Sequence, residues 1–337
     1  MKRRLVFGLI LAALCVLAVP AAPEGVDAQE TITLRLATQA PRGSQWHRAF
    51  RAWAGSVQEE SGGRLRLQFF FGGSQGDERD YVRKMESGQL DGASVTTTGL
   101  GQVARPVLVL SAPGLIRTNR QMDRVRRSLG NRFKQEFENA GYVHMGDGDV
   151  GLARFFSNRA INRPQDLRQT RPWARPDDPI VNTFYEVVGA SPQRAGINEL
   201  LPGLQTGRIN AFPSSALATI SLQWHNHATH VTQQSTGVVV GATIIKKEKV
   251  EALPEDLRTI LSETSVRAHQ VLTRSIRRAD DRAFTALTEG DNARLTAVDL
   301  SANQGDWDRA LSQTRQRLAG RLYPADLLQA VERAAGN

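Results

Sequence analysis

The sequence predicts an α/β protein with two lobes that face each other across a cleft, and three observations carry this prediction. Residues 32–92 alternate between strand and helix patterns, which favours a mainly parallel sheet covered by helices. Two similar segments, 85–93 and 204–212, each contain a Gly that ends a helix, an apolar residue that opens a strand, and then Asp or Asn. Residues 254–290 have a helical pattern without an internal Pro, long enough to run across both lobes.

The opening elements follow one another at short intervals. Alternating apolar residues over 32–36 and again over 65–71 predict two strands, because the buried face of a strand repeats every second residue. Apolar residues over 46–57 recur at helical spacing between them. A further helix is expected over 77–88, since Asp and Glu stand in its first turn and Gly ends it.

The later elements complete two lobes and a hinge. We expect a helix over 120–140, a strand over 142–145, extended chain over 151–161, a helix over 178–188, strands within 231–245, the long helix over 254–290 and an amphipathic helix over 304–335. At 1.5 Å per residue the long helix is about 50 Å long, which exceeds one lobe. Crossing strands near 151 and over 238–243 are predicted to form the hinge. Permissive backbone there is expected from Gly146, Gly148, Gly151, Gly237 and Gly241.

Residues 1–28 are predicted to be a signal peptide. A charged start, Lys2 to Arg4, precedes an apolar run over 5–19 that is too short for a comfortable membrane span. Small residues over 26–28 predict cleavage before Gln29, while Ala21-Ala22 is an alternative site and an uncleaved anchor a second alternative. We therefore expect a periplasmic protein.

The cysteine content agrees with export but offers no chemistry. The single cysteine, Cys15, lies inside the predicted leader, so the mature chain is expected to have no disulfide and no thiol chemistry. Leu14 precedes it where a lipoprotein needs a small residue, which argues against lipidation.

A net charge of +9 can indicate a protein that binds nucleic acid. The basic residues are scattered at solvated helix positions, without a dense block interleaved with aromatics. We therefore predict no nucleic-acid partner and interpret the charge mainly as solvation, with a weak indication of an anionic ligand.

Catalytic and metal motifs are weak in this sequence. Residues 146–151 match G-x-G-x-x-G, but a strand pattern follows and two aspartates in the loop would repel phosphate, which favours a hinge turn. His225, His227 and His230 have metal-ligand spacing without a nearby Asp, Glu or Cys, which favours a polar loop. No G-x-S-x-G, Walker loop or H-E-x-x-H occurs. We predict no enzyme, no catalytic residue, no cofactor and no metal.

Over about residues 31–290 the chain resembles the solute-binding subunit of tripartite ATP-independent periplasmic (TRAP) transporters. The resemblance rests on the order of short segments at 34–44, 60–64, 76–78, 88–91, 157–161, 166–168, 188–192, 204–207 and 254–255. It implies a type II periplasmic-binding-protein fold, in which two α/β lobes joined by hinge strands close on a ligand. We place lobe 1 in 29–152 plus about 241–280, and lobe 2 in 153–240 plus about 281–337.

The resemblance also implies a function. The protein is expected to capture a small organic ligand, either a carboxylate or a more apolar molecule, and to deliver it as a monomer to the TRAP membrane subunits. Two alternatives stay open within binding proteins: a periplasmic carrier of a lipidic ligand, and the binding protein of another type of importer.

The predicted site departs from the family pattern. The position of the family's carboxylate-binding Arg falls on Trp173, and Arg175 follows two residues later. A second basic contact falls near Ala153, beside Arg154, and a family Asn falls on Ser214. The resemblance therefore implies a branch without the usual carboxylate clamp, because Trp supplies an apolar face and one donor instead of a bidentate fork.

The expected cleft is elongated and mostly apolar, with one polar end. Besides the family positions, we place in it Phe212 and Ser215 of the second lobe. From the first lobe we place Thr97, which follows the equivalent strand, and Trp46, at the start of the first helix.

Overall fold

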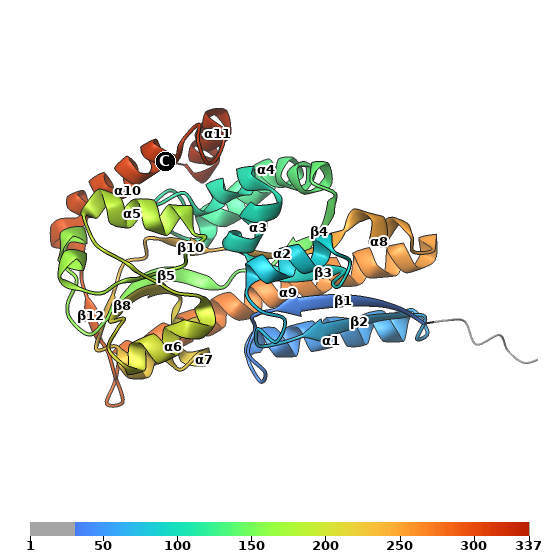
Figure 1. The fold of residues 1–337 in the computed structure, drawn as a ribbon, viewed down its shortest axis with the longest axis horizontal. Coiled ribbons are helices and arrows are strands. Elements are labelled where there is room, and N and C mark those ends of the chain that lie inside the picture. The colour runs from blue at the N-terminus through green and yellow to red at the C-terminus, as the bar shows by residue number, and fades with distance from the viewer. Residues whose placement is uncertain (1–30, 337) are drawn as a thin grey trace, which may run out of the picture. The chain divides into compact units, whose positions relative to one another are not determined.

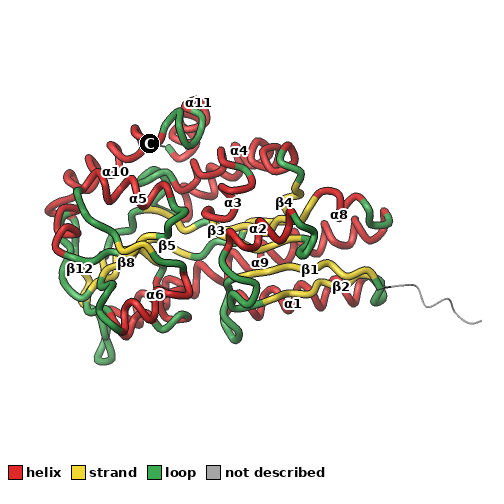
Figure 2. Tube along the Cα trace, in the orientation of Figure 1, coloured by secondary structure: helices red, strands yellow, loops and turns green. Residues whose placement is uncertain are grey.

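The computed structural model describes residues 31–336, and the predicted signal peptide, residues 1–28, lies outside them. Within the described residues no helix combines the length and the apolar character needed to cross a membrane. Both predicted sheets are present, and helices cover their faces (Figure 2).

The first sheet holds the first three strands of the chain. Its strands are β1 (Ile32–Thr38), β2 (Leu65–Phe70), β3 (Gly92–Thr96), β4 (Tyr142–Asp147) and β11 (Gly241–Lys246), in the order β2-β1-β3-β11-β4. β1 pairs in parallel with β2 and β3, whereas β11 runs antiparallel to both its neighbours. We call this sheet and its helices the first lobe.

Several helices of the first lobe begin at a residue whose side chain caps them. The helices of the first lobe are α1 (Gln45–Glu60), α2 (Glu78–Glu86), α3 (Thr97–Val103), the 3₁₀ helix η1 (Arg105–Ser111), α4 (Asn119–Asn139) and α8 (Lys247–Glu251). Ser44 caps α1 by accepting the amide of His47 at 3.2 Å. Asp77 caps α2, and the Asp80 side chain in turn accepts the backbone amide of Asp77 at 2.8 Å. Such pairs satisfy backbone N–H groups that a helix start leaves open.

The second lobe is built on β5 (Gly151–Ser157). β5 pairs antiparallel with β8 (Ala211–Ser214), β9 (His230–Thr232) and β10 (Gly237–Val239), while β12 (Thr296–Val298) adds to β9. A small pair, β6 (Trp173–Ala174) and β7 (Gln193–Arg194), lies beside it. The covering helices are η2 (Pro164–Gln169), α5 (Pro179–Val188), α6 (Ile197–Gln205), α7 (Ala216–Ser221), η3 (Trp224–His227), η4 (Ser301–Asn303) and α10 (Gln304–Leu318).

Two segments cross between the lobes, as predicted for a hinge. β4 continues into β5, and β10 continues into β11, so each crossing joins the two sheets. The crossings bond to each other: the Gly148 amide donates to Gly241 at 2.8 Å and the Val150 amide to Val239 at 2.9 Å. Motion about these segments stays a prediction.

The glycines of the crossings serve close packing more than turn flexibility. Of the five predicted positions, only Gly151 has a left-handed φ, of 132°. A Cβ at Gly146 would lie 2.4 Å from the His269 ring, and one at Gly151 would lie 2.5 Å from the Asp280 carboxyl carbon. Both neighbours belong to the long helix, which therefore approaches the crossing segments closely.

The long helix is confirmed as one unbroken element, α9 (Glu255–Thr288), which packs on both lobes (Figure 1). It contacts α1 and β4 in the first lobe and α7 and β5 in the second. Asp280 ties it to the second lobe, accepting the amides of Leu152 at 2.8 Å and Leu217 at 2.9 Å.

One packing expectation is wrong. Residues 281–337 were assigned to the second lobe, but α11 (Ala325–Ala335) packs against α4 and η1 of the first (Figure 1). Its apolar face, with Leu327 and Val331, is buried in the same core as Val125 and Phe133 of α4. A chain that follows α9 can return across both lobes, and local periodicity does not reveal where it packs.

Candidate functional site

A cavity of about 680 Å³ lies between the lobes, within the range of small-molecule sites. Both lobes line it, through α1, α3 and η1 on one side and β5, α5 and α7 on the other. Its walls are mainly apolar and include Trp46, Phe50, Leu108, Trp173, Phe184 and Trp224.

Trp173 forms both cavity wall and core. Its indole Nε1 donates to the backbone oxygen of Ala195 at 2.9 Å, and its ring meets Trp224 edge-on at 6.0 Å. Tyr185 donates to the Trp173 backbone oxygen at 3.0 Å. The indole donor is therefore already used by the protein, and the ring offers the cavity an apolar surface.

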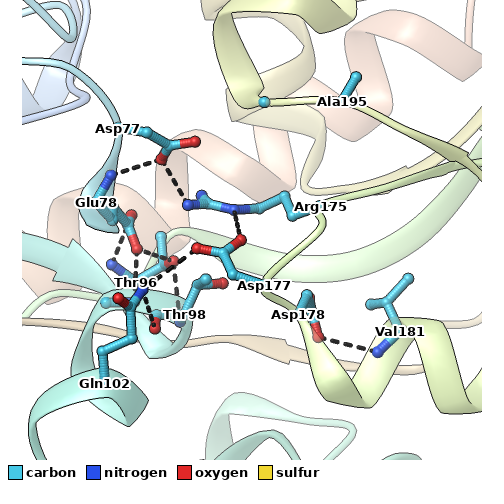
Figure 3. A network of polar contacts seen from close by, with 12 residues as sticks. Asp77, Glu78, Thr96, Thr98, Gln102, Arg175, Asp177, Asp178, Val181 and Ala195 are labelled. Atoms are coloured by element: carbon cyan, nitrogen blue, oxygen red, sulfur yellow. Dashed lines mark hydrogen bonds and ion pairs between the residues drawn. The ribbon is translucent and has the colours of Figure 1, made fainter. Parts of the chain in front are cut away.

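Arg175 also lines the cavity, but its side chain is directed at protein carboxylates (Figure 3). Its Nη2 donates to Asp77 Oδ1 at 2.6 Å, and its Nε to Asp177 Oδ1 at 3.4 Å. Asp177 Oδ2 accepts from Gln102 Nε2 of α3 at 3.3 Å. These bonds join the loop after β6 in the second lobe to α2 and α3 in the first.

Glu78 is a cavity residue that sequence reasoning treated only as a helix-start acid. It is 1% exposed, and its carboxylate accepts the amide of Thr96 at 3.0 Å, the Thr96 hydroxyl at 2.9 Å and the amide of Gly99 at 2.8 Å. It thus binds the start of α3 from a neighbouring helix. No local signal reveals this role, because its partners lie about twenty residues later in the chain.

The acids around Arg175 alter its ionisation. Burial disfavours its charge, but Glu78, Asp77, Asp177 and Asp178 more than compensate and hold the Arg175 pKa above its ordinary value. Burial raises the pKa of Asp178, although its side chain accepts the amides of Ile180 and Val181. Arg175 therefore remains a cation in an acidic cluster.

Four further predicted residues line the cavity: Trp46, Thr97, Ser214 and Ser215. The indole of Trp46 donates to the Asp149 backbone oxygen at 3.3 Å. Thr97 accepts from Ser111 at 3.0 Å, and Ser215 donates to the Val150 backbone oxygen at 2.7 Å. The bonds of Trp46 and Ser215 therefore tie one element of each lobe to the crossing segment beside the cavity.

Two predicted residues, Phe212 and Arg154, do not line the cavity. Within a pair of strands, residues opposite each other point to the same side, and the sides alternate along each strand. Ser214 is the exception here: it ends β8 opposite Arg154 and still borders the cavity. Ala153 and Phe155 of β5 face the cavity, so Arg154 faces away and lies 4.0 Å from the ring centre of Phe284.

Phe212 falls on the same far side by register. It pairs with Phe156, and the two rings stack at 5.5 Å in a core beneath the sheet. Its neighbour Pro213 faces the cavity instead.

The weak motifs have structural explanations. Residues 146–151 end β4 and begin the crossing to β5, with no helix after them. His225 and His227 belong to η3 and His230 to β9. Within residues 31–336 no group of three or more His, Cys, Asp or Glu is arranged to hold a metal ion.

Comparison with known proteins agrees with this geometry. A family described as "Bacterial extracellular solute-binding protein, family 7" matches residues 36–316. The chain is 28% identical over 203 residues to a solute-binding protein of Roseobacter denitrificans. The matched segment covers 60% of this chain and 61% of that relative.

Two solved structures are similar in fold. A TRAP periplasmic solute-binding protein from Sulfitobacter, with bound β-D-galacturonate, has a TM-score of 0.82 at 15% identity, covering 90% of this chain and 100% of that one. One from Shewanella oneidensis, with bound succinate, has a TM-score of 0.83 at 14% identity, covering 90% and 99%. The likeness establishes the type II periplasmic-binding-protein fold.

Proposed function

The chain belongs to bacterial extracellular solute-binding protein family 7, and from this premise we propose that it captures a small organic ligand between its lobes for transport. The observation that carries the proposal is the mostly apolar cavity of about 680 Å³ lined by both lobes. Crossing strands and α9 join these lobes, so ligand contacts with both sides favour the closed arrangement.

The proposed partners follow from the family. The ligand is delivered to TRAP membrane subunits, and the protein acts in the periplasm as a monomer, after loss of residues 1–28. Its proposed role is binding and not catalysis. N-terminal sequencing of the exported protein tests the leader, and the expected first residue is Gln29.

A cavity-filling variant tests the binding site. Thr98 lines the cavity from the first turn of α3, so Thr98→Trp places a large ring in it. Native mass spectrometry of the exported protein is expected to detect a co-purified small molecule in the wild type and none in Thr98→Trp.

The matched control is Thr259→Trp, at an exposed position of α9. It is expected to retain the molecule at the wild-type level. Retention by both variants would contradict the cavity as the binding site, and a co-purified acyl chain would favour the carrier alternative.

A further inference from the structure

We propose that the cavity takes an uncharged, mainly apolar ligand and that it does not hold a ligand carboxylate. This inference rests on the proposed function and names the ligand class of the same site.

Two arginines supply the positive charge of the cavity wall. Arg105 and Arg175 are the only cations among the described residues that line the cavity. Arg105 is exposed, so water screens its charge. Arg175 is the buried one, and its guanidinium donates to Asp77 at 2.6 Å and to Asp177 at 3.4 Å. The buried cation is therefore neutralised by the protein itself.

Negative groups outnumber positive ones at this end of the cavity. Asp77 and Asp177 both pair with the single Arg175, and the buried Glu78 lies next to Asp77 in the chain and lines the same cavity. A carboxylate brought to this end of the cavity would lie near more negative than positive groups. Like charges in a buried site repel strongly, because the surroundings screen them less than water does.

The buried carboxylates at this end of the cavity do not need a positively charged ligand. Glu78 already accepts two bonds from Thr96 and one from Gly99, and Asp178 accepts two backbone amides. Buried carboxylates that hold their own donors do not require a ligand ammonium. The cation and these carboxylates at this end of the cavity therefore already have partners within the protein.

The remaining surface suits an apolar body. Indole rings of Trp46, Trp173 and Trp224 line the cavity, and aromatic side chains contribute most of the contact area in such sites. Thr97 and Thr98 also line it, and a hydroxyl group is able to bond to a neutral polar group.

The test combines two organic acids with three phenylpropyl compounds that differ mainly in charge, and it removes the acidic partners of Arg175. Calorimetry measures binding of succinate, galacturonate, 3-phenylpropionate, 3-phenylpropanamide and 3-phenylpropylamine to the wild type and to Asp77→Asn/Asp177→Asn. Asn keeps an acceptor at both positions but removes the two charges. The control is Asp256→Asn/Asp326→Asn, which changes the net charge equally at two solvent-exposed ion pairs.

We expect the wild type and the control to show no saturable binding of the three acids. The Arg175-freeing variant is expected to show saturable binding of at least one of them, with an affinity at least tenfold above the weakest binding that the titration of the control could detect. The amide is expected to bind the wild type more tightly than the acid or the amine of the same skeleton.

Three outcomes would overturn the inference: wild-type binding of an acid, preference for the amine over the amide, or no gain of acid binding in the freed variant. Thr98→Trp separates these from failure of the proposed function. Acid binding that Thr98→Trp abolishes contradicts only the ligand class, whereas binding of any probe that survives Thr98→Trp contradicts the site itself.

Discussion

The guanidinium of Arg175 donates to the carboxylate of Asp77 at 2.6 Å, and this bond joins the two lobes beside the cavity. Asp77 also caps α2, so the first lobe supplies a fixed acceptor. The pair links the lobes and gives the Arg175 charge a partner within the protein (Figure 3).

Removing this cation should destabilise the protein. Arg175→Met leaves Asp77 and Asp177 without their shared counter-ion, and breaking a buried pair from one side costs about 3 kcal/mol. Urea unfolding measures the loss, and small-angle scattering should show more open lobes. Arg79→Met, at an exposed position of α2, is the control and should change stability by less than about 0.5 kcal/mol.

Trp173→Phe should separate the role of this residue in folding from its role in binding. The change leaves the Ala195 carbonyl without its donor and should cost about 1–2 kcal/mol in urea unfolding. Trp53→Phe is the matched control, because Trp53 donates to Thr264 inside the core of the first lobe. Only Trp173→Phe is expected to weaken binding of the co-purified ligand; equal effects on binding would place Trp173 in the core alone.

His269 should make stability depend on pH below neutrality. It is buried on α9, its Nδ1 donates to the Ser265 backbone oxygen at 2.8 Å, and its Nε2 lies 2.8 Å from the Thr243 hydroxyl. Burial lowers the pKa of His269 to about 4 from an ordinary 6.5, and the nearby His144 lowers it further. The bond to Ser265 and the charge of Asp147 raise the pKa, but by less.

The sign follows from proton binding. Between pH 6.5 and 4 the unfolded chain takes up a proton at His269 and the folded chain does not, so stability is full above pH 6.5 and falls towards pH 4. The free energy of unfolding that His269 protonation removes over this pH range is about 3 kcal/mol in total. Urea unfolding at several pH values should therefore give a smaller slope for His269→Gln than for the wild type, and parallel slopes would contradict this.

Gly151→Ala should be costly at the crossing. Gly151 has a φ of 132°, and an added Cβ would lie 2.5 Å from the Asp280 carboxyl carbon. Asp280 accepts the Leu152 amide there, so we expect a loss of at least about 2 kcal/mol in thermal or urea unfolding.

Gly130→Ala provides the opposite case. Gly130 lies in α4, and a Cβ there meets nothing within 4 Å. The helix should gain about 0.5–1 kcal/mol. If both glycine variants changed stability alike, the positive φ and close packing at Gly151 would not carry the expected cost.

Elements with strong local periodicity could be predicted from the sequence. The alternation over 32–36 became β1, and the uninterrupted helical pattern after Pro254 became α9, because these patterns depend on neighbours within one or two turns. Six of the eight candidate site residues also line the cavity, from strand ends and from the first turns of helices that meet there.

Register and long-range pairing were decided only by the tertiary structure. Whether Arg154 and Phe212 face the cavity depends on how β5 and β8 pair, since a shift of one residue turns every side chain to the other face. The partner of Arg175 lies 98 residues earlier, at Asp77. The sequence determined two lobes around an apolar cavity; the tertiary structure decided that its buried cation is neutralised, because charge balance depends on groups that only folding brings together.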